Sequence, residues 1–166
     1  MREPVLKPAS GRFSYSYVQD VLKSAGIDNV LFLDANYVLP GNDDDPVNGI
    51  VHGRFIDAIN EYSDYLHKHL LKYTPELFDC DDFAWTFKAF CHMHKINGVG
   101  FAIGRLCQND KFLGWHAFNI VPYAMSPNSV IVLLFEPQLA PFDGITPYNH
   151  GAKLWNLRYE VVEVIF

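Results

Sequence analysis

The feature that most constrains the fold is a change in the spacing of apolar residues near residue 98. Before it, apolar residues recur at helical spacing over residues 54–72 and again over about 80–94. After it come four segments rich in β-branched and aromatic residues, separated by the turn-forming stretches QNDK, SPNS and PFDG: 99–106, 112–123, 130–138 and 157–166. Helices followed by a run of antiparallel strands are typical of an α+β fold.

The first 50 residues carry weaker signals. A short helix is expected over residues 14–26, and a strand or buried segment over 30–39. Residues 40–49 are dense in turn formers, which predicts a loop. The length of the chain suits one domain over residues 1–166, with 1–50 as an N-terminal lead-in of undefined role.

Composition and charge narrow the classes of partner. The net charge of −6 argues against nucleic acid, because phosphate binding requires a basic surface. No stretch reaches the roughly 18 apolar residues of a membrane span, so no membrane partner is expected, and the N-terminus lacks the apolar run of a signal peptide. Three cysteines without the spacing of a disulfide framework predict a reduced, cytoplasmic protein. The oligomeric state is left open.

The stretch FDCDDFAW places a cysteine at the expected start of a helix, with Asp79 as a plausible N-cap. The positive end of the helix dipole favours the thiolate of Cys80, which is the nucleophilic form. Asp79, Asp81 and Asp82 act in the opposite direction, because nearby negative charges raise the pKa of a thiol. A nucleophilic Cys80 therefore needs a cationic partner, or a metal ion that neutralises the carboxylates.

His116 is the best candidate for that partner, because of seven histidines it is the one inside an apolar strand, in GWHAFNIV. If the hairpin places Pro122 opposite Val130, His116 faces Glu136 on one otherwise apolar face of the sheet. A slip of one residue would destroy this alignment. A carboxylate beside the imidazole fixes its tautomer, as in nucleophilic triads. The order Cys80, His116, Glu136 therefore predicts a thiol site.

Three short motifs between about residues 78 and 138 resemble those of the papain-like and transglutaminase-like superfamily of cysteine enzymes. CDDFA resembles the nucleophile motif of bacterial transglutaminase-like cysteine peptidases, and HAFN resembles their histidine strand. EPQ is closer to the calcium-dependent protease domain of mushroom agglutinins of the Marasmius type. The resemblance implies a papain/transglutaminase-like core, with Cys80 as nucleophile, His116 as base and Glu136 as the acid that orients it.

The chain departs from the papain pattern before the cysteine, where residues 72–79 contain neither Gln nor Asn to bind the oxyanion. The backbone N–H of Cys80 and the side chain of Gln138 are the remaining candidate donors.

The leading hypothesis for function is thus a thiol hydrolase, a cysteine peptidase or amidase acting on a peptide or protein substrate. Transglutaminase or deamidase acyl transfer uses the same residues. The alternative outside the enzymes is a non-catalytic binding module on the same fold, with a metal ion as a candidate ligand of Asp81 and Asp82. A further alternative is metal-dependent hydrolysis through Cys80, Asp82 and His116.

One acidic pair and one acidic run are candidate metal sites. Asp81 and Asp82 favour the helix dipole as residues of the first turn, or they hold a hard cation. The agglutinin resemblance implies calcium for that position, although no cofactor is predicted as required. The run Asp43 to Asp45 is interpreted as a solvated loop. Cys91 and Cys107 are interpreted as structural.

Overall fold

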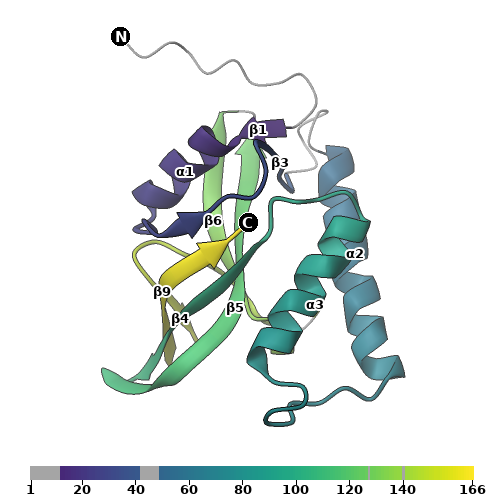
Figure 1. The fold of residues 1–166 in the computed structure, drawn as a ribbon, viewed down its shortest axis with the longest axis vertical. Helices are drawn as coiled ribbons and strands as arrows, with labels where there is room; N and C mark the ends of the chain where they lie inside the picture. The colour runs from purple at the N-terminus through teal and green to yellow at the C-terminus, as the bar shows by residue number, and fades with distance from the viewer. Residues whose placement is uncertain (1–11, 42–48, 127, 140) are drawn as a thin grey trace.

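A central β-sheet organises the molecule (Figure 1). The computed structural model describes residues 12–41, 49–126, 128–139 and 141–166. Within these residues the sheet has seven strands: β2 (Val30–Leu31), β4 (Gly100–Gln108), β5 (Lys111–Ser126), β6 (Ser129–Phe135), β7 (Ile145–Pro147), β8 (Ala152–Leu154) and β9 (Leu157–Ile165). Their order is β2-β9-β4-β5-β6-β7, with β8 paired to β9. The β2–β9 pair is parallel and the other pairs are antiparallel.

Helices cover both faces of this sheet (Figure 1). They are α1 (Tyr15–Ser24), α2 (Gly49–Lys68) and α3 (Cys80–Met93), and a short 3-10 turn covers Pro137–Leu139. A small antiparallel pair, β1 (Arg12–Ser14) with β3 (Asn36–Val38), lies beside α1. Among the described residues, no helix is both long enough and apolar enough to cross a membrane.

The alternation of side chains along β5 explains why both faces are covered. Phe118 and Ile120 belong to the core cluster that includes Leu22 of α1. Val121, on the opposite face, belongs to the cluster that includes Phe87 of α3. Because side chains alternate along a strand, a central strand that is apolar at successive positions buries both faces.

The hairpin between β4 and β5 is closed by two residues with positive φ, Asn109 at 48° and Asp110 at 60°. Two left-handed residues in a two-residue loop form the turn whose twist matches antiparallel strands. The turn expected at QNDK is therefore present, with Gln108 paired to Lys111.

Several expected elements differ in extent from those observed. The helix expected over 80–94 corresponds to α3, whereas α2 begins and ends earlier than the expected 54–72. The segment 30–39 forms two short strands, β2 and β3, that belong to different sheets. The strands β1, β7 and β8 were not expected, because three-residue strands leave little periodicity in a sequence. The Asp43 to Asp45 run lies outside the described residues.

The register of the β5–β6 hairpin is shifted from the expected one by two residues. Pro122 pairs with Val132, not with Val130. Because the side-chain period of a strand is two, this shift leaves His116 and Glu136 on the same face. The predicted register was wrong by two residues. The prediction that His116 and Glu136 share one face of the sheet is still correct.

The predicted arrangement of helices on an antiparallel sheet is also wrong. Helix α1 packs on the face opposite to α2 and α3, and β2 makes the sheet mixed. More of the described residues lie in strands than in helices. The prediction failed because the first 40 residues, treated as a lead-in, supply a strand to the sheet and a helix to its second face.

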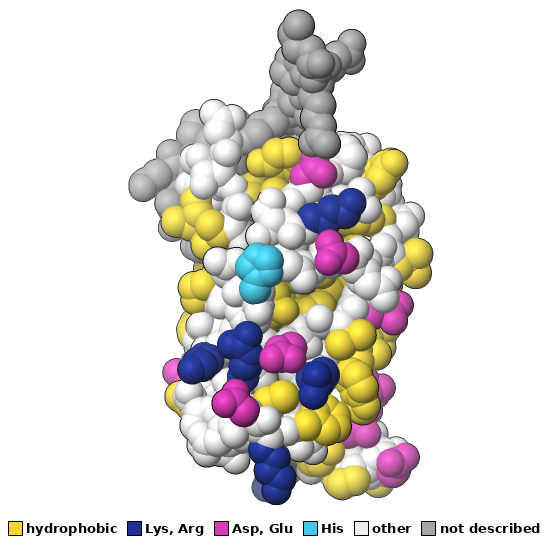
Figure 2. All heavy atoms as spheres, turned by 90° about the vertical axis from the view of Figure 1, so that its left-hand side faces the viewer, with side chains coloured by type: hydrophobic (Ala, Val, Ile, Leu, Met, Phe, Trp, Pro, Cys, Tyr) yellow, Lys and Arg dark blue, Asp and Glu magenta, His cyan; other side chains and the backbone are white. Residues whose placement is uncertain are grey.

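The face that carries α1 differs in charge pattern from a nucleic-acid-binding surface. Figure 2 shows the side toward which α1 lies, where Lys and Arg side chains alternate with Asp and Glu. Charges of both signs at close spacing screen one another and build no strong field of one sign.

The α2–α3 cluster gives the first testable prediction. Phe87 is fully buried, and its ring contacts those of Phe55, Tyr62 and Phe135. We expect Phe87→Ala to lower the free energy of unfolding by about 3–5 kcal/mol, because a large cavity is left. Urea denaturation measures this. Phe112→Ala, at a half-exposed ring, is the matched control, and an equal loss in both variants would contradict the assignment.

Candidate functional site

A buried carboxylate lies at the centre of the candidate site. Glu136 follows β6 and is 3% exposed. Its Oε2 accepts hydrogen bonds from His116 Nε2 at 2.5 Å and from the Tyr159 hydroxyl at 3.1 Å. Its Oε1 accepts from the backbone N–H of Gln138 at 3.2 Å. Buried carboxylates are costly unless paired in this way, so the site is built to hold Glu136 in one position.

The imidazole of His116 is held between Glu136 and the thiol of Cys80. Burial lowers the pKa of His116, but hydrogen bonds to Cys80 and Glu136, and their negative charges, more than offset this and raise it to about 9. His116 is therefore protonated at neutral pH and forms an ion pair with Glu136. Since Nε2 faces Glu136, Nδ1 is the ring nitrogen left for the thiol.

Two contacts between α3 and the sheet bring Cys80 to this place. Its Sγ accepts a hydrogen bond from the backbone N–H of Ala117 at 3.5 Å. The fully buried Asn119 donates through Nδ2 to the carbonyl of Ala84 in α3, at 3.0 Å, and to that of Gly100 in β4, at 3.2 Å. Asn119 thus fastens the first turn of α3 against β4 and β5.

Asp79 caps the start of α3, as the sequence indicated, and this cap uses the carboxylate of Asp82. The backbone N–H of Asp79 donates to Asp82 Oδ2 at 3.2 Å, which is one half of a capping box. The carboxylate of Asp82 is therefore occupied by the helix end. Whether Asp81 and Asp82 together hold a metal ion stays a prediction.

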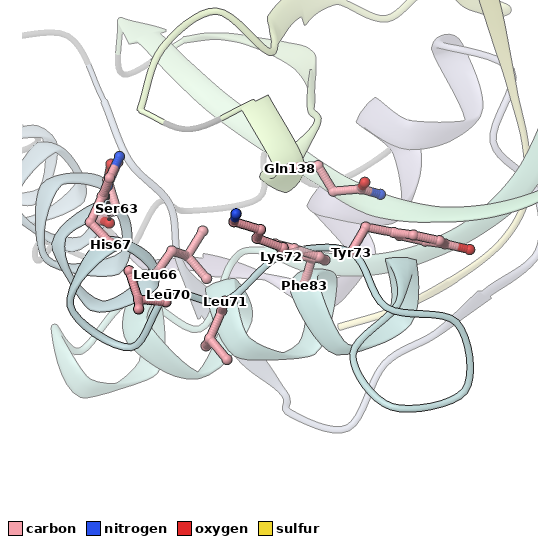
Figure 3. A pocket seen from close by; sticks show the side chains of 9 residues that line it. All are labelled: Ser63, Leu66, His67, Leu70, Leu71, Lys72, Tyr73, Phe83 and Gln138. Carbon is pink, nitrogen blue, oxygen red and sulfur yellow. Dashed lines mark hydrogen bonds between the residues drawn. The ribbon is translucent and has the colours of Figure 1, made fainter.

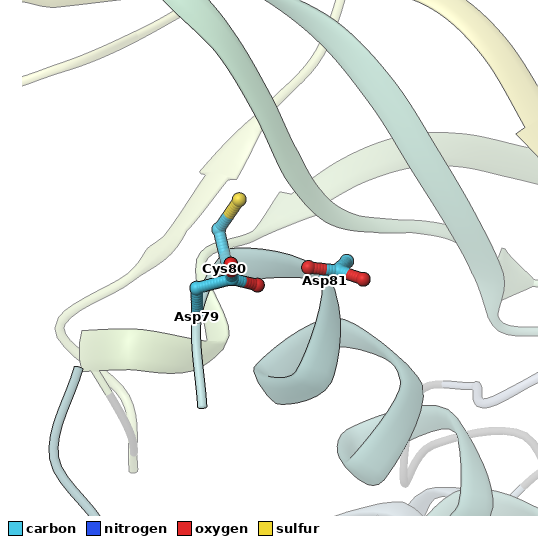
Figure 4. A group of neighbouring side chains, drawn as sticks. All are labelled: Asp79, Cys80 and Asp81. Carbon is cyan, nitrogen blue, oxygen red and sulfur yellow. The ribbon is translucent and has the colours of Figure 1, made fainter. Parts of the chain in front are cut away.

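The candidate metal group consists of Asp79, Cys80 and Asp81, whose potential ligand atoms lie within 4.8 Å of one another (Figure 4). A hydrogen bond between the two carboxyl groups is the main reason that the pKa of Asp81 is raised. Calcium takes six to eight oxygen ligands, and this group offers two carboxylates and a thiol. The fit to calcium is partial, and a cation at this position stays a prediction.

A small hollow opens beside Glu136. Its volume is about 190 Å³, and we call it the Glu136 pocket; it is lined by Leu106, His116, Glu136, Gln138, Leu139, Trp155, Leu157 and Tyr159. Trp155 is 71% exposed and adopts a positive φ of 56°. The pocket therefore combines a buried ion pair with a large apolar ring at its edge.

The structure brings together Cys80, His116 and Glu136, and it places Gln138 next to them. The backbone N–H of Gln138 binds Glu136, and whether its side chain donates to an oxyanion stays a prediction. Chemically, nucleophilic catalysis by a thiol needs an imidazole within reach, and Cys80 and His116 are neighbours in the structure.

Two contributors were missed from the sequence. Tyr159 lies at an inward-facing position of β9, and the alternation of Leu157, Tyr159 and Val161 could have indicated this. Trp155 lies in the turn between β8 and β9, where no periodic pattern exists. Its place in the pocket follows only from the tertiary fold.

Comparison with known proteins gives a fold but no family. No family model matches the chain, and no curated protein matches it. Among solved structures, the PSL1a-E64 complex aligns with a TM-score of 0.56 and 23% identity, over 94% of this chain and 51% of that one. The Polyporus squamosus lectin bound to a human-type influenza-binding epitope aligns with a TM-score of 0.57 and 20% identity, over 94% and 50%.

The chain thus spans about half the length of the solved chains that it matches. At this level of identity the likeness establishes a shared fold and leaves the ligand open.

These comparisons correct the resemblance drawn from short motifs. The fold is shared with a lectin, and no cysteine-peptidase family model matches. The prediction of a papain/transglutaminase-like cysteine peptidase is therefore wrong, and the comparisons give no support to a peptide or protein substrate. The error arose because CDDFA, HAFN and EPQ are each only three to five residues long, so they describe a local arrangement and do not define a family.

The pKa of His116 predicts a pH dependence of stability. Because the folded pKa, about 9, lies above the usual value near 6.5, the stabilisation is fully present below about pH 6.5. It is lost as the pH rises through 9. We expect the difference in unfolding free energy between wild type and His116→Gln to shrink by on the order of 2 kcal/mol across that range.

Urea denaturation at a series of pH values measures this difference. Subtracting the variant removes other titrating groups, such as Lys88, whose pKa burial lowers to about 8. His69→Gln, at an exposed position just after α2, serves as the control. A difference that stays constant from pH 6 to pH 10 would contradict the assigned pKa.

Proposed function

We propose that this chain is a binding module whose ligand is a carbohydrate, held in the Glu136 pocket. The observation that carries the proposal is the arrangement of that pocket, in which the fixed polar groups of His116, Glu136 and Gln138 lie beside the exposed ring of Trp155. A sugar ring presents hydroxyl groups at its edge and C–H groups on its faces, so it matches polar groups beside an aromatic surface.

The size of the pocket and the comparisons support the same class of ligand. A volume of about 190 Å³ is below the range of pockets for drug-sized ligands and suits a single ring. The lectin of the same fold is bound to a glycan epitope. Because this chain matches only half of that lectin, the identity of the glycan does not carry over.

A glycan array followed by NMR titration of each positive oligosaccharide tests the proposal. We expect Trp155→Ala to weaken binding by about tenfold or more, since a stacked aromatic surface is lost. Trp115→Ala is the matched control, because Trp115 is 63% exposed and lies outside the pocket. No binding to any glycan, or equal affinity of both variants, would contradict the proposal.

A second candidate function rests on Cys80, His116 and Glu136. The proximity of Cys80 to His116, which contributes to the raised pKa of the imidazole, supports acyl transfer of the transglutaminase type. In this step the Cys80 thiolate bonds to the carbonyl carbon of an amide, and the C–N bond breaks. His116 gives a proton to the departing nitrogen, and the thioester passes its acyl group to an amine, which regenerates the thiol.

The rate of alkylation by iodoacetamide from pH 5 to pH 9 tests whether Cys80 is nucleophilic. Peptide mass spectrometry separates Cys80 from the buried Cys91 and Cys107, and glutathione provides an exposed reference thiol. We expect Cys80 to react at least about tenfold faster than glutathione below pH 8, and His116→Gln to abolish that advantage. Equal rates for Cys80 and glutathione would exclude the second candidate.

A further inference from the structure

A second and larger hollow lies next to the Glu136 pocket and has no role in the functions above. Its volume is about 460 Å³, and it lies between the end of α2, the segment that follows it, α3 and Gln138 (Figure 3). We call it the Lys72 pocket. Gln138 lines both hollows, so the two sites adjoin.

The walls of the Lys72 pocket are mainly apolar. They are formed by side chains from the C-terminal part of α2, from the chain after it and from the first turns of α3: Leu66, Leu70, Leu71, Tyr73 and Phe83. Leu70 is 79% exposed and Tyr73 is 55% exposed. Apolar side chains that remain exposed while lining one concave surface are typical of a site that buries an apolar group.

The charge of the Lys72 pocket is opposite to that of the whole protein. Lys72 lines the hollow, where its side chain extends toward the Leu66 side (Figure 3), and it makes no ion pair with any described residue. His67 is the other titratable base, and none of the described side chains that line the pocket is acidic. Lys72 is exposed at the mouth of this hollow. In a chain of net charge −6, an ammonium that pairs with no described carboxylate favours an anionic group.

We propose that the Lys72 pocket binds a small apolar carboxylic acid, with the carboxylate on the Lys72 ammonium and the hydrocarbon against Leu66, Leu70 and Phe83. The volume lies in the range that accepts small organic ligands. A carboxylate on an ammonium forms a charge-assisted hydrogen bond, which is stronger where neighbouring apolar walls exclude water. The site goes beyond the carbohydrate proposal and does not depend on it.

The probe is octanoate, with octanamide as the uncharged molecule of matched size. Titration of the ¹⁵N-labelled protein, followed by ¹H–¹⁵N correlation spectra, locates and quantifies binding. We expect octanoate to shift the amides around Leu70 to Tyr73 and Phe83. We expect octanamide to bind at the same place about tenfold more weakly, since it lacks the charge.

Two variants separate the charge from the apolar wall. Lys72→Met keeps the length of the side chain, and it is expected to reduce octanoate affinity to that of octanamide. Leu70→Asn suits the positive φ of 52° at this position, and it is expected to weaken both probes. Lys111→Met, in the β4–β5 hairpin, is the matched control and should change neither.

Several results would overturn the proposal: no saturable octanoate binding at millimolar concentration, equal affinity of the two probes, or an unchanged affinity in Lys72→Met. Trp155→Ala distinguishes this site from the carbohydrate site, because it is expected to leave octanoate binding unchanged. Failure of one proposal therefore does not decide the other.

Discussion

The carboxylate of Glu136 is the interaction on which the candidate site depends. It is almost fully buried, and its three donors come from three separate segments: His116 in β5, Tyr159 in β9 and Gln138 in the turn after β6. In the sheet, β4 separates β9 from β5, so the carboxylate joins strands that are not neighbours. Removing any one donor leaves part of a buried charge unpaired, which is more costly than the loss of a surface contact.

The position of Cys80 depends on a second set of contacts, on the other face of β5. Asn119 alternates with Phe118 and points toward α3, where it binds backbone groups of α3 and β4. The first turn of α3 is thereby fixed against the strand that carries His116. One strand, through residues of both faces, thus places the imidazole of His116 beside both the thiol and the carboxylate. The same helix supplies Phe83 to the Lys72 pocket.

Local features of the site could be predicted from the sequence, because they depend on periodicity and on helix ends. The start of α3 after Asp79 follows from capping preferences. The shared face of His116 and Glu136 survived a two-residue error in register, because a shift of two preserves the side of the sheet. The partners Tyr159 and Trp155 could not be found in the same way, since their contacts join segments that only the tertiary fold brings together.

The placement of helices on the two faces of the sheet and the fold as a whole were harder to predict from the sequence. The number of faces that helices cover is decided by where α1 and β2 dock, and short strands such as β2 carry no clear pattern. Motifs of a few residues resembled a cysteine peptidase, although the fold is shared with a lectin over about half of the lectin chain. Three side chains in contact define a local chemistry, and the fold that carries them is a separate question.

The most direct test of this account is the pKa of His116, measured by NMR of the imidazole in wild type and in Glu136→Gln. We expect a pKa of about 9 in wild type and a lower pKa in the variant, because the amide keeps the shape of the carboxylate but loses its charge. A wild-type pKa near the usual 6.5, or one that Glu136→Gln leaves unchanged, would contradict it. In that case the buried ion pair would not be the element that organises the site.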